Sequence, residues 1–163
     1  MKRIINVDEV VLERHEHGDK FAAGDGAVGT MIGSRLLGAS LIVVPPGKRA
    51  YPFHCHHVNE EMFVVLDGVG AIRIGEDTFP LEAGDIIAAP LGGRAEAHQI
   101  INTSEHELRY LAVSTMIQND VIEYPDADKV AVYVGSAPGE EPGPRTFNFR
   151  GHLGARADYW DGE

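Results

Sequence analysis

Apolar and polar residues alternate in short runs through the middle of the chain. Runs of this length, rich in Val, Ile and Leu and separated by Gly, Pro, Asp or Asn, predict short β-strands. The predicted strands cover 38–44, 51–56, 61–67, 70–74, 77–81, 85–89, 97–102 and 107–114. No segment keeps a helical apolar period over three turns, so we expect little helix. Many short strands at regular spacing are typical of an antiparallel sandwich or barrel, and therefore of an all-β fold.

The C-terminal part of the chain is less regular than this middle part. The segment VIEYPDADKVAVYVG predicts one or two short strands, and the residues after it are rich in proline and glycine. Tyr159 and Trp160 follow near the end, and we expect this aromatic pair to pack on the barrel or on a neighbouring subunit. We divide the chain into an N-terminal arm (1–37), a barrel (38–116), and C-terminal strands with a tail that packs on the barrel or a dimer partner (117–163).

The N-terminal region contains two motifs that we interpret as decoys. Residues 1–13 alternate weakly and predict an edge strand, whereas residues 14–35 predict a long ordered arm or loop rich in glycine and charge. His15 and His17 have a His-x-His spacing without a carboxylate at a suitable offset, so we expect them in a solvated loop. The GxGxxG at 24–29 lacks the preceding strand and following helix of a dinucleotide-binding turn, so nucleotide binding is not expected.

Candidate metal ligands lie in the stretch GKRAYPFHCHHVNEEMFVVLDG, at residues 47–68. Its FHCH segment is predicted to be extended, so His54 and His56 point to one face, about 6.5–7 Å apart at the backbone. Two imidazoles from one strand can hold one divalent metal ion. Glu61 begins the next predicted strand, and a hairpin can bring its carboxylate to the same ion.

A second stretch, GDIIAAPLGGRAEAHQIIN at residues 84–102, supplies His98. Both stretches resemble the two signature motifs of the cupin superfamily. The matching residues are Gly47, His54, His56, Glu61 and Gly68 in the first motif, and Gly84, Pro90, Gly92, His98 and Asn102 in the second. This sequence has one extra residue before His54 and three extra between Gly92 and His98. The resemblance covers residues 38–116 and implies a double-stranded β-helix (jelly-roll) barrel with extensions at both ends. The metal ligands it implies are His54, His56, Glu61 and His98.

This ligand set of three imidazoles and one carboxylate leaves one or two positions open on a six-coordinate ion. Nitrogen and oxygen ligands without a thiolate suit Mn, Fe, Ni, Co or Zn, although Zn more often takes four ligands. Glu60 is the competing carboxylate, but alternation places Glu61 on one face with Phe63 and Val65. Cys55 lies one residue off the ligand face, so we interpret it as a small core residue.

No residue is marked by its spacing as the acid or base of a reaction. The candidates near the predicted ligands are Tyr51, Gln99, Tyr110 and Arg73. His57 is either a group at the rim of the site or a surface histidine. Lys48 and Arg49 either attract an anionic substrate or are solvated beside the PPGK turn.

The acidic composition narrows the range of partners. The chain has 14 basic and 25 acidic residues, and its formal charge of −11 disfavours nucleic acid and anionic membranes as partners. No apolar run approaches the ~20 residues of a membrane span, and the N-terminus does not resemble a signal peptide. A single cysteine forms no intrachain disulfide. We expect a cytoplasmic protein that acts on a small molecule, and a homodimer, because sheet edges need cover.

Three functions fit this predicted site. In the first, the metal acts as a Lewis acid on a sugar or hydroxy-carbonyl compound while a base moves a proton, which gives isomerisation. In the second, Fe(II) or Mn binds substrate and dioxygen, and the protein is a dioxygenase. In the third, the protein binds a small molecule without catalysis. The resemblance to small cupins that are regarded as sugar-phosphate isomerase-like favours the first function, with the catalytic residues unassigned.

Overall fold

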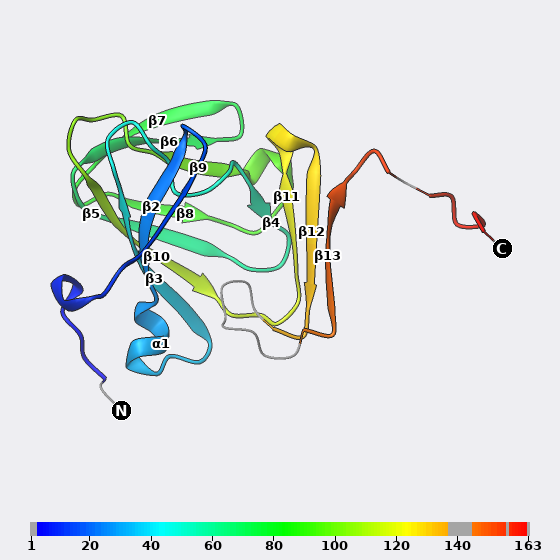
Figure 1. Ribbon diagram of the computed structural model, residues 1–163, viewed down its shortest axis with the longest axis horizontal. Helices are drawn as coiled ribbons and strands as arrows, with labels where there is room; N and C mark the ends of the chain where they lie inside the picture. The colour runs from blue at the N-terminus through cyan, green and yellow to red at the C-terminus, as the bar shows by residue number, and fades with distance from the viewer. Residues whose placement is uncertain (1–2, 137–144, 156, 163) are drawn as a thin grey trace.

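Strands dominate the computed structural model, which describes residues 3–136, 145–155 and 157–162 (Figure 1). The strands are β1 (Glu13–His17), β2 (Phe21–Gly26), β3 (Leu37–Val44), β4 (Cys55–His56), β5 (Glu61–Asp67), β6 (Val69–Ile74), β7 (Asp77–Glu82), β8 (Ile86–Ala89), β9 (His98–Ile101), β10 (Leu108–Thr115), β11 (Asp120–Tyr124), β12 (Lys129–Val134) and β13 (Phe147–His152). The helices are α1 (Val28–Ile32) and the 3-10 turns Val7–Glu9, Arg94–Glu96 and Pro125–Ala127. The predicted strands appear as β3 to β10, although the one at 51–56 is reduced to β4 and a backbone bridge at His54.

The main core lies between two antiparallel sheets. The larger sheet has the order β1-β2-β3-β10-β5-β8, and the smaller one has the order β7-β6-β9. Ile42, Val65 and Leu108 of the larger sheet are buried in one apolar cluster with Ile72 and Ile100 of the smaller sheet. Two antiparallel sheets that enclose one core form the double-stranded β-helix, or jelly roll. The prediction of an all-β jelly-roll fold is therefore confirmed.

The predictions for the N-terminal region are wrong. Val7–Glu9 is a 3-10 helix rather than part of an edge strand, and the predicted loop at 14–35 contains strands β1 and β2 and helix α1. Strand β2 pairs with β3, so this region extends the larger barrel sheet. The error arises because β2 has the composition FAAGDG, whose small residues have low strand propensity. Pairing with β3 and contact with the apolar side chains before β1 override that propensity.

Close packing explains the GxGxxG pattern at residues 24–29. A Cβ on Gly26 would lie 2.3 Å from Cγ1 of Val10, and a Cβ on Gly29 would lie 2.9 Å from the backbone nitrogen of Ala39. These glycines therefore let the N-terminal segment and α1 approach the sheet closely. The helix is only five residues long. Among the described residues, none of the helices has the length and apolar character that crossing a membrane requires.

The C-terminal strands form a third sheet beside the barrel, with the order β13-β12-β11-β4 (Figure 1). Strands β11 and β12 fall within the segment predicted to hold one or two strands, whereas β13 was not predicted. Tyr159 and Trp160 are exposed and contact each other edge to face, and their packing on the barrel or on a neighbouring subunit stays a prediction. Figure 1 shows the tail running away from the sheets beyond β13.

Candidate metal centre

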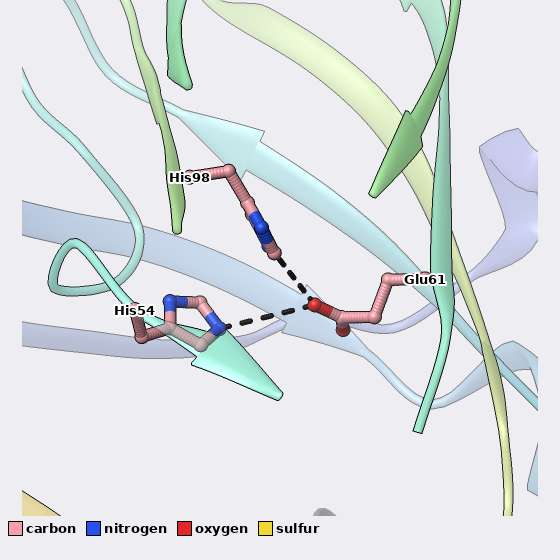
Figure 2. Close-up of side chains that lie close together, drawn as sticks. All are labelled: His54, Glu61 and His98. Atoms are coloured by element: carbon pink, nitrogen blue, oxygen red, sulfur yellow. Dashed lines mark hydrogen bonds and ion pairs between the residues drawn. The ribbon is translucent and has the colours of Figure 1, made fainter. Parts of the chain in front are cut away.

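The predicted ligands converge on one oxygen atom, Oε2 of Glu61. The Nε2 atoms of His54, His56 and His98 lie 3.8, 3.4 and 3.1 Å from it. Figure 2 shows His54 and His98 pointing at this carboxylate from two sides. One ligand atom from each of His54, Glu61 and His98 lies within 4.8 Å of the others, which is a suitable spacing for a shared cation. His56 is outside that tightest group but reaches the same oxygen.

Backbone pairing brings these side chains together. His54 and His98 form an isolated antiparallel bridge, in which the backbone N–H of each donates to the carbonyl of the other, at 3.2 and 2.8 Å. Glu61 begins β5 in the middle of the larger sheet, between β10 and β8. Glu60 is exposed, whereas Phe63 and Val65 continue the face of Glu61 into the core. The structure therefore places Glu61, rather than Glu60, at the cluster.

Each imidazole is oriented by a hydrogen bond from its other nitrogen. Nδ1 of His54 donates to the Pro52 carbonyl at 2.8 Å, and Nδ1 of His98 donates to the Glu96 carbonyl at 3.2 Å. Nδ1 of His56 lies 2.6 Å from Oδ2 of Asp120. Because carbonyl and carboxylate oxygens only accept, Nδ1 carries the ring proton in all three residues. In the neutral rings, Nε2 then presents a lone pair to the other groups.

This arrangement fits a divalent cation. Lone pairs on three Nε2 atoms and an anionic oxygen on Glu61 repel one another unless a positive charge lies among them. The oriented imidazoles resemble those of metal sites, where the nitrogen that does not bind the metal donates to a carboxylate or carbonyl. The His/Glu cluster could therefore bind a metal ion, and its nitrogen and oxygen donors do not select among Mn, Fe, Ni, Co and Zn. The assignment of the four ligands stays a prediction.

Asp120 is the residue of the site that sequence reasoning missed. It is buried and comes from β11, beyond the predicted barrel at 38–116. Oδ2 accepts from His56 Nδ1 and from Asn59 Nδ2 at 3.0 Å, and Oδ1 accepts from the backbone N–H groups of Val58 and Val121 at 3.2 and 2.8 Å. The sequence offered a weak signal, since Asp120 precedes the alternating segment VIEY. Nothing in that pattern identifies its partner 64 residues away.

The electrostatics of the cluster keep the His54 ring neutral and the Glu61 and Asp120 carboxylates ionised near neutral pH. Burial lowers the pKa of His54 to about 4, so its ring is neutral at pH 7. Burial raises the pKa of Glu61, but in acid the protonated rings of His98, through its hydrogen bond, and of His56 and His54, through their charges, outweigh burial and lower that pKa to about 2. Burial likewise raises the pKa of Asp120, and hydrogen bonds from His56 and Asn59 reverse the effect and lower it. Both carboxylates are therefore ionised at neutral pH.

A phenol–carboxylate pair lies in the same part of the barrel. The Tyr51 hydroxyl donates to Oδ2 of Asp25, which lies on β2 opposite Ile42 of the core. Partial burial, followed by the charge of Asp25, raises the pKa of Tyr51, and Glu61 contributes to the same shift. Tyr110 is buried, and its pKa is raised by burial and by the charges of Glu61 and Asp25. Phe63 connects Tyr110 to the Glu61 cluster, since its ring centroid lies 5.9 Å from that of Tyr110 and 5.3 Å from that of His98.

The other predicted acid–base and anion-binding candidates have structural partners. Gln99 Nε2 donates to the Tyr51 carbonyl at 2.8 Å. Arg73 lies over the Phe53 ring, 3.6 Å from its centroid, and both of its bonds to the Asp126 carboxylate are at the surface. Lys48 Nζ donates to the Asp19 carbonyl at 2.5 Å. The remaining candidate, the guanidinium of Arg49, has a buried Nε without a hydrogen-bond partner among the described residues.

The fold and the cluster define an antiparallel jelly roll with a His/Glu site that could bind a metal ion. Residues 40–114 match the family model of the cupin domain. These residues therefore form a cupin domain, and the predicted family resemblance is confirmed. No curated protein sequence matches the chain.

Solved structures share this fold over most of the chain. A candidate sugar phosphate isomerase from Acidithiobacillus ferrooxidans has 24% identity and a TM-score of 0.78, with 96% of each chain covered. A sugar phosphate isomerase of the cupin superfamily from Silicibacter pomeroyi has 18% identity and a TM-score of 0.76, with 97% of this chain and 98% of that chain covered. A predicted oxalate decarboxylase from Thermotoga maritima has 23% identity and a TM-score of 0.59, with 70% of this chain and 99% of that chain covered. At these identities the similarity shows the fold.

Proposed function

We propose that the protein is a metal-dependent enzyme that isomerises a small hydroxy-carbonyl compound of the sugar-phosphate type. The observation that carries the proposal is the convergence of three imidazoles on Glu61, with the hydrogen-bonded pair Tyr51–Asp25 linked to this cluster by the bond from Gln99, next to His98, to the Tyr51 carbonyl. A cation site and a group that moves protons are the two components that such a reaction needs. The names of the Acidithiobacillus and Silicibacter proteins, whose folds match over nearly the whole chain, support the same reaction class.

In this proposal His54, His56, Glu61 and His98 would hold the metal ion. When bound, the ion supplies Lewis-acid stabilisation of negative charge on a substrate oxygen. The chain's contribution is to fix the ligands before substrate arrives. The Pro52 and Glu96 carbonyls and the Asp120 carboxylate hold the three imidazoles by their Nδ1–H groups. Such outer hydrogen bonds keep each ring in one tautomer and orientation.

Tyr51 and Asp25 are the groups that we assign to proton transfer. Because its pKa is raised, the Tyr51 phenol keeps its proton at neutral pH and acts as a donor toward a substrate oxygen. Oδ2 of Asp25, which accepts the Tyr51 O–H in the resting protein, would take the proton from the carbon next to the substrate carbonyl and return it to the adjacent carbon. Gln99 positions this pair through its bond to the Tyr51 carbonyl.

A dioxygenase is the second candidate function. The observation that favours it is the ligand chemistry, because three imidazoles and a carboxylate, without a thiolate, suit Fe(II) or Mn as well as non-redox ions. The predicted oxalate decarboxylase shares the fold over 70% of this chain. One fold can host several different reactions, so the fold does not favour isomerisation over oxygenation. A protein that binds a small molecule without catalysis is the third candidate.

Hydrogen exchange in deuterium oxide tests the proposal. Metal-loaded protein is incubated under nitrogen with aldose and ketose phosphates, and proton NMR follows the C–H group next to the carbonyl. We expect metal-dependent exchange of this proton together with interconversion of aldose and ketose. Tyr51→Phe should slow both by about 10²–10⁴-fold, the usual contribution of a positioned acid or base, without changing the bound metal. Tyr159→Phe, at an exposed tyrosine, is the matched control and should have no effect.

An oxygen electrode separates this proposal from its main competitor. Oxygen uptake that requires both substrate and Fe(II) would overturn the isomerase proposal and favour the dioxygenase. Saturable binding of a sugar phosphate without exchange, interconversion or oxygen uptake would favour the non-enzymatic function. The His54→Ala/His56→Ala variant shows in each assay whether the signal depends on the metal cluster.

A further inference from the structure

A second group of potential metal ligands lies on the opposite side of the same short strand. Cys55, His57 and Glu123 each offer one ligand atom, and these three atoms lie within 4.8 Å of one another. Nε2 of His57 is 3.5 Å from Oε2 of Glu123. In an extended strand, side chains alternate between faces. The even-numbered histidines 54 and 56 therefore serve the Glu61 cluster, while Cys55 and His57 face this second group.

The pairing of β4 with β11 assembles the group. Cys55 is paired with Glu123 across the two strands, and the backbone N–H of His57 donates to the Val121 carbonyl at 2.9 Å. The register of the paired strands therefore places these three side chains together. Their proximity does not depend on contacts between surface side chains. Pre-assembled ligands lose little conformational entropy when an ion binds.

We propose that Cys55, His57 and Glu123 form a second metal site, which takes one borderline divalent ion such as Zn²⁺ or Co²⁺. Zn²⁺ is bound by Cys sulfur, His nitrogen and carboxylate oxygen, and a site with three protein ligands leaves a fourth position open. On binding, the Cys55 thiol releases its proton to solvent, and the sulfur donates an electron pair to the ion. This site is independent of the proposed isomerase function.

Arg94 leaves one oxygen of Glu123 available for the ion. The guanidinium binds Oε1 of Glu123 and lies 3.2 Å from Oδ1 of Asp128, whereas Oε2 faces His57. Two carboxylates therefore surround one guanidinium, so the local charge stays negative before any ion binds. Arg94 acts here as an outer partner that orients the ligating carboxylate.

The three side chains range from buried to partly exposed to solvent, as an ion-binding site at the protein surface requires. Cys55 is 1% exposed, the Glu123 side chain is 14% exposed, and the His57 side chain is 39% exposed. An ion would enter past His57 and bind against a closed inner wall formed by the buried thiol. Once bound, it would clamp β4 to β11, the strand whose first residue, Asp120, holds His56. Such a clamp is a structural role, distinct from the chemistry of the Glu61 cluster.

Titration of metal-free protein with Co²⁺ tests the site, because a cobalt–thiolate bond gives a charge-transfer absorption band in the near ultraviolet. The Glu61 cluster contains no sulfur, so it is silent in this band. We expect wild-type protein to bind two equivalents of Co²⁺ and to show the band. Cys55→Ser should lose the band and one equivalent, whereas His54→Ala/His56→Ala should keep the band.

Two milder variants keep the test decisive if Cys55→Ser fails to fold. Glu123→Gln and His57→Gln change partly exposed side chains and leave the thiol in place, and circular dichroism checks their fold. The absorption band measures Co²⁺ binding in these variants. Each variant should bind Co²⁺ about tenfold or more weakly than wild-type protein, because each removes one of three ligands. Absence of the band in wild-type protein, or unchanged Co²⁺ affinity in both variants, would overturn the proposal.

Discussion

Oδ2 of Asp120 lies 2.6 Å from Nδ1 of His56, across 64 residues of sequence. The contact joins β11 of the C-terminal sheet to a predicted ligand of the barrel. Asp120 is fully engaged, since Asn59 and two backbone N–H groups also donate to it. A carboxylate behind a metal-binding imidazole fixes the ring and increases its basicity. Strand β11 therefore supports the predicted metal cluster, although it lies outside residues 40–114, which match the cupin domain.

Asp120→Asn is the first test of this relationship. The change keeps the size of the side chain but removes its charge, so the bond to His56 becomes weaker and the ring less basic. We expect metal affinity to fall by about 10–100-fold, as measured by competition with a chromophoric chelator. Asp126→Asn, at an exposed carboxylate that pairs with Arg73, is the matched control and should leave affinity unchanged. Equal affinities for all three proteins would show that Asp120 is only structural.

The two His-x-His pairs of the chain provide a matched comparison for the ligands. His54→Ala/His56→Ala removes two of the four predicted ligands, so we expect elemental analysis to find one equivalent of metal fewer than in wild-type protein. His15→Ala/His17→Ala has the same spacing on the exposed strand β1 and should retain the metal of wild-type protein. Full occupancy of the cluster after the first double change would refute the ligand assignment.

Some residues of this site could be predicted from the sequence, and others could not. His54, His56, Glu61 and His98 were identified because each follows a local rule of spacing or alternation, and the strands that carry them have strong apolar patterns. Asp120 and Asp25 were missed because their roles depend on partners in distant strands, which no local pattern encodes. Strand β2 was missed for a related reason, since its small residues are extended only because β3 and the apolar N-terminal residues pack against them.

The metal-free cluster should make the protein sensitive to acid. The pKa of His54 is lowered from 6.5 to about 4 by burial, so below pH 6.5 the unfolded chain binds a proton that the folded chain does not. Stability is therefore lost as the pH falls from 6.5 toward 4, by up to about 3 kcal/mol for this shift. Glu61, with a pKa lowered to about 2, adds a loss between pH 4.5 and 2. The pKa of His56 is raised in the folded protein, so its effect on stability is opposite to that of His54. Its stabilising contribution to the free energy of unfolding is complete below pH 6.5 and is lost as the pH rises through its folded pKa.

Urea unfolding in the presence of a chelator measures this dependence. We expect the free energy of unfolding of wild-type protein to decrease more steeply between pH 6.5 and 4 than that of His54→Gln, which lacks the titrating ring. The variant also serves as the control for the other groups, which it retains. Parallel curves for the two proteins would contradict the assignment of this acid sensitivity to His54.

Substitutions at two glycines of the cupin motifs compare the cost of backbone strain with the cost of a steric clash. Gly68 and Gly84 both have a left-handed backbone, with φ of +87° and +100°. A Cβ at Gly68 would lie 2.4 Å from the carbonyl oxygen of Glu107, whereas a Cβ at Gly84 would meet nothing within 4 Å. Gly84→Ala should cost about 1–2 kcal/mol for the left-handed conformation alone. Gly68→Ala should cost about 1–3 kcal/mol more, because backbone must move. Urea unfolding checks both variants, and equal losses would contradict the packing argument.

Strand β13 is the edge at which we expect a homodimer to form. It pairs only with β12 among the described strands, and its Phe147 and Phe149 are 53% and 46% exposed. An edge strand with exposed aromatic residues favours pairing with another chain, and covering it removes apolar surface from water. In Figure 1 the strand borders its sheet, and the C-terminal tail follows it.

Light scattering tests this arrangement. Wild-type protein at micromolar concentration should have about twice the chain mass of 17.7 kDa. Phe147→Glu/Phe149→Glu places two charges on the edge and should shift the protein toward monomer. Phe79→Glu, at a similarly exposed phenylalanine on β7, is the control and should leave the dimer intact, because β7 is not part of the proposed interface. A wild-type monomer would contradict the dimer itself, whereas dissociation by Phe79→Glu alone would move the interface from β13 to the smaller barrel sheet.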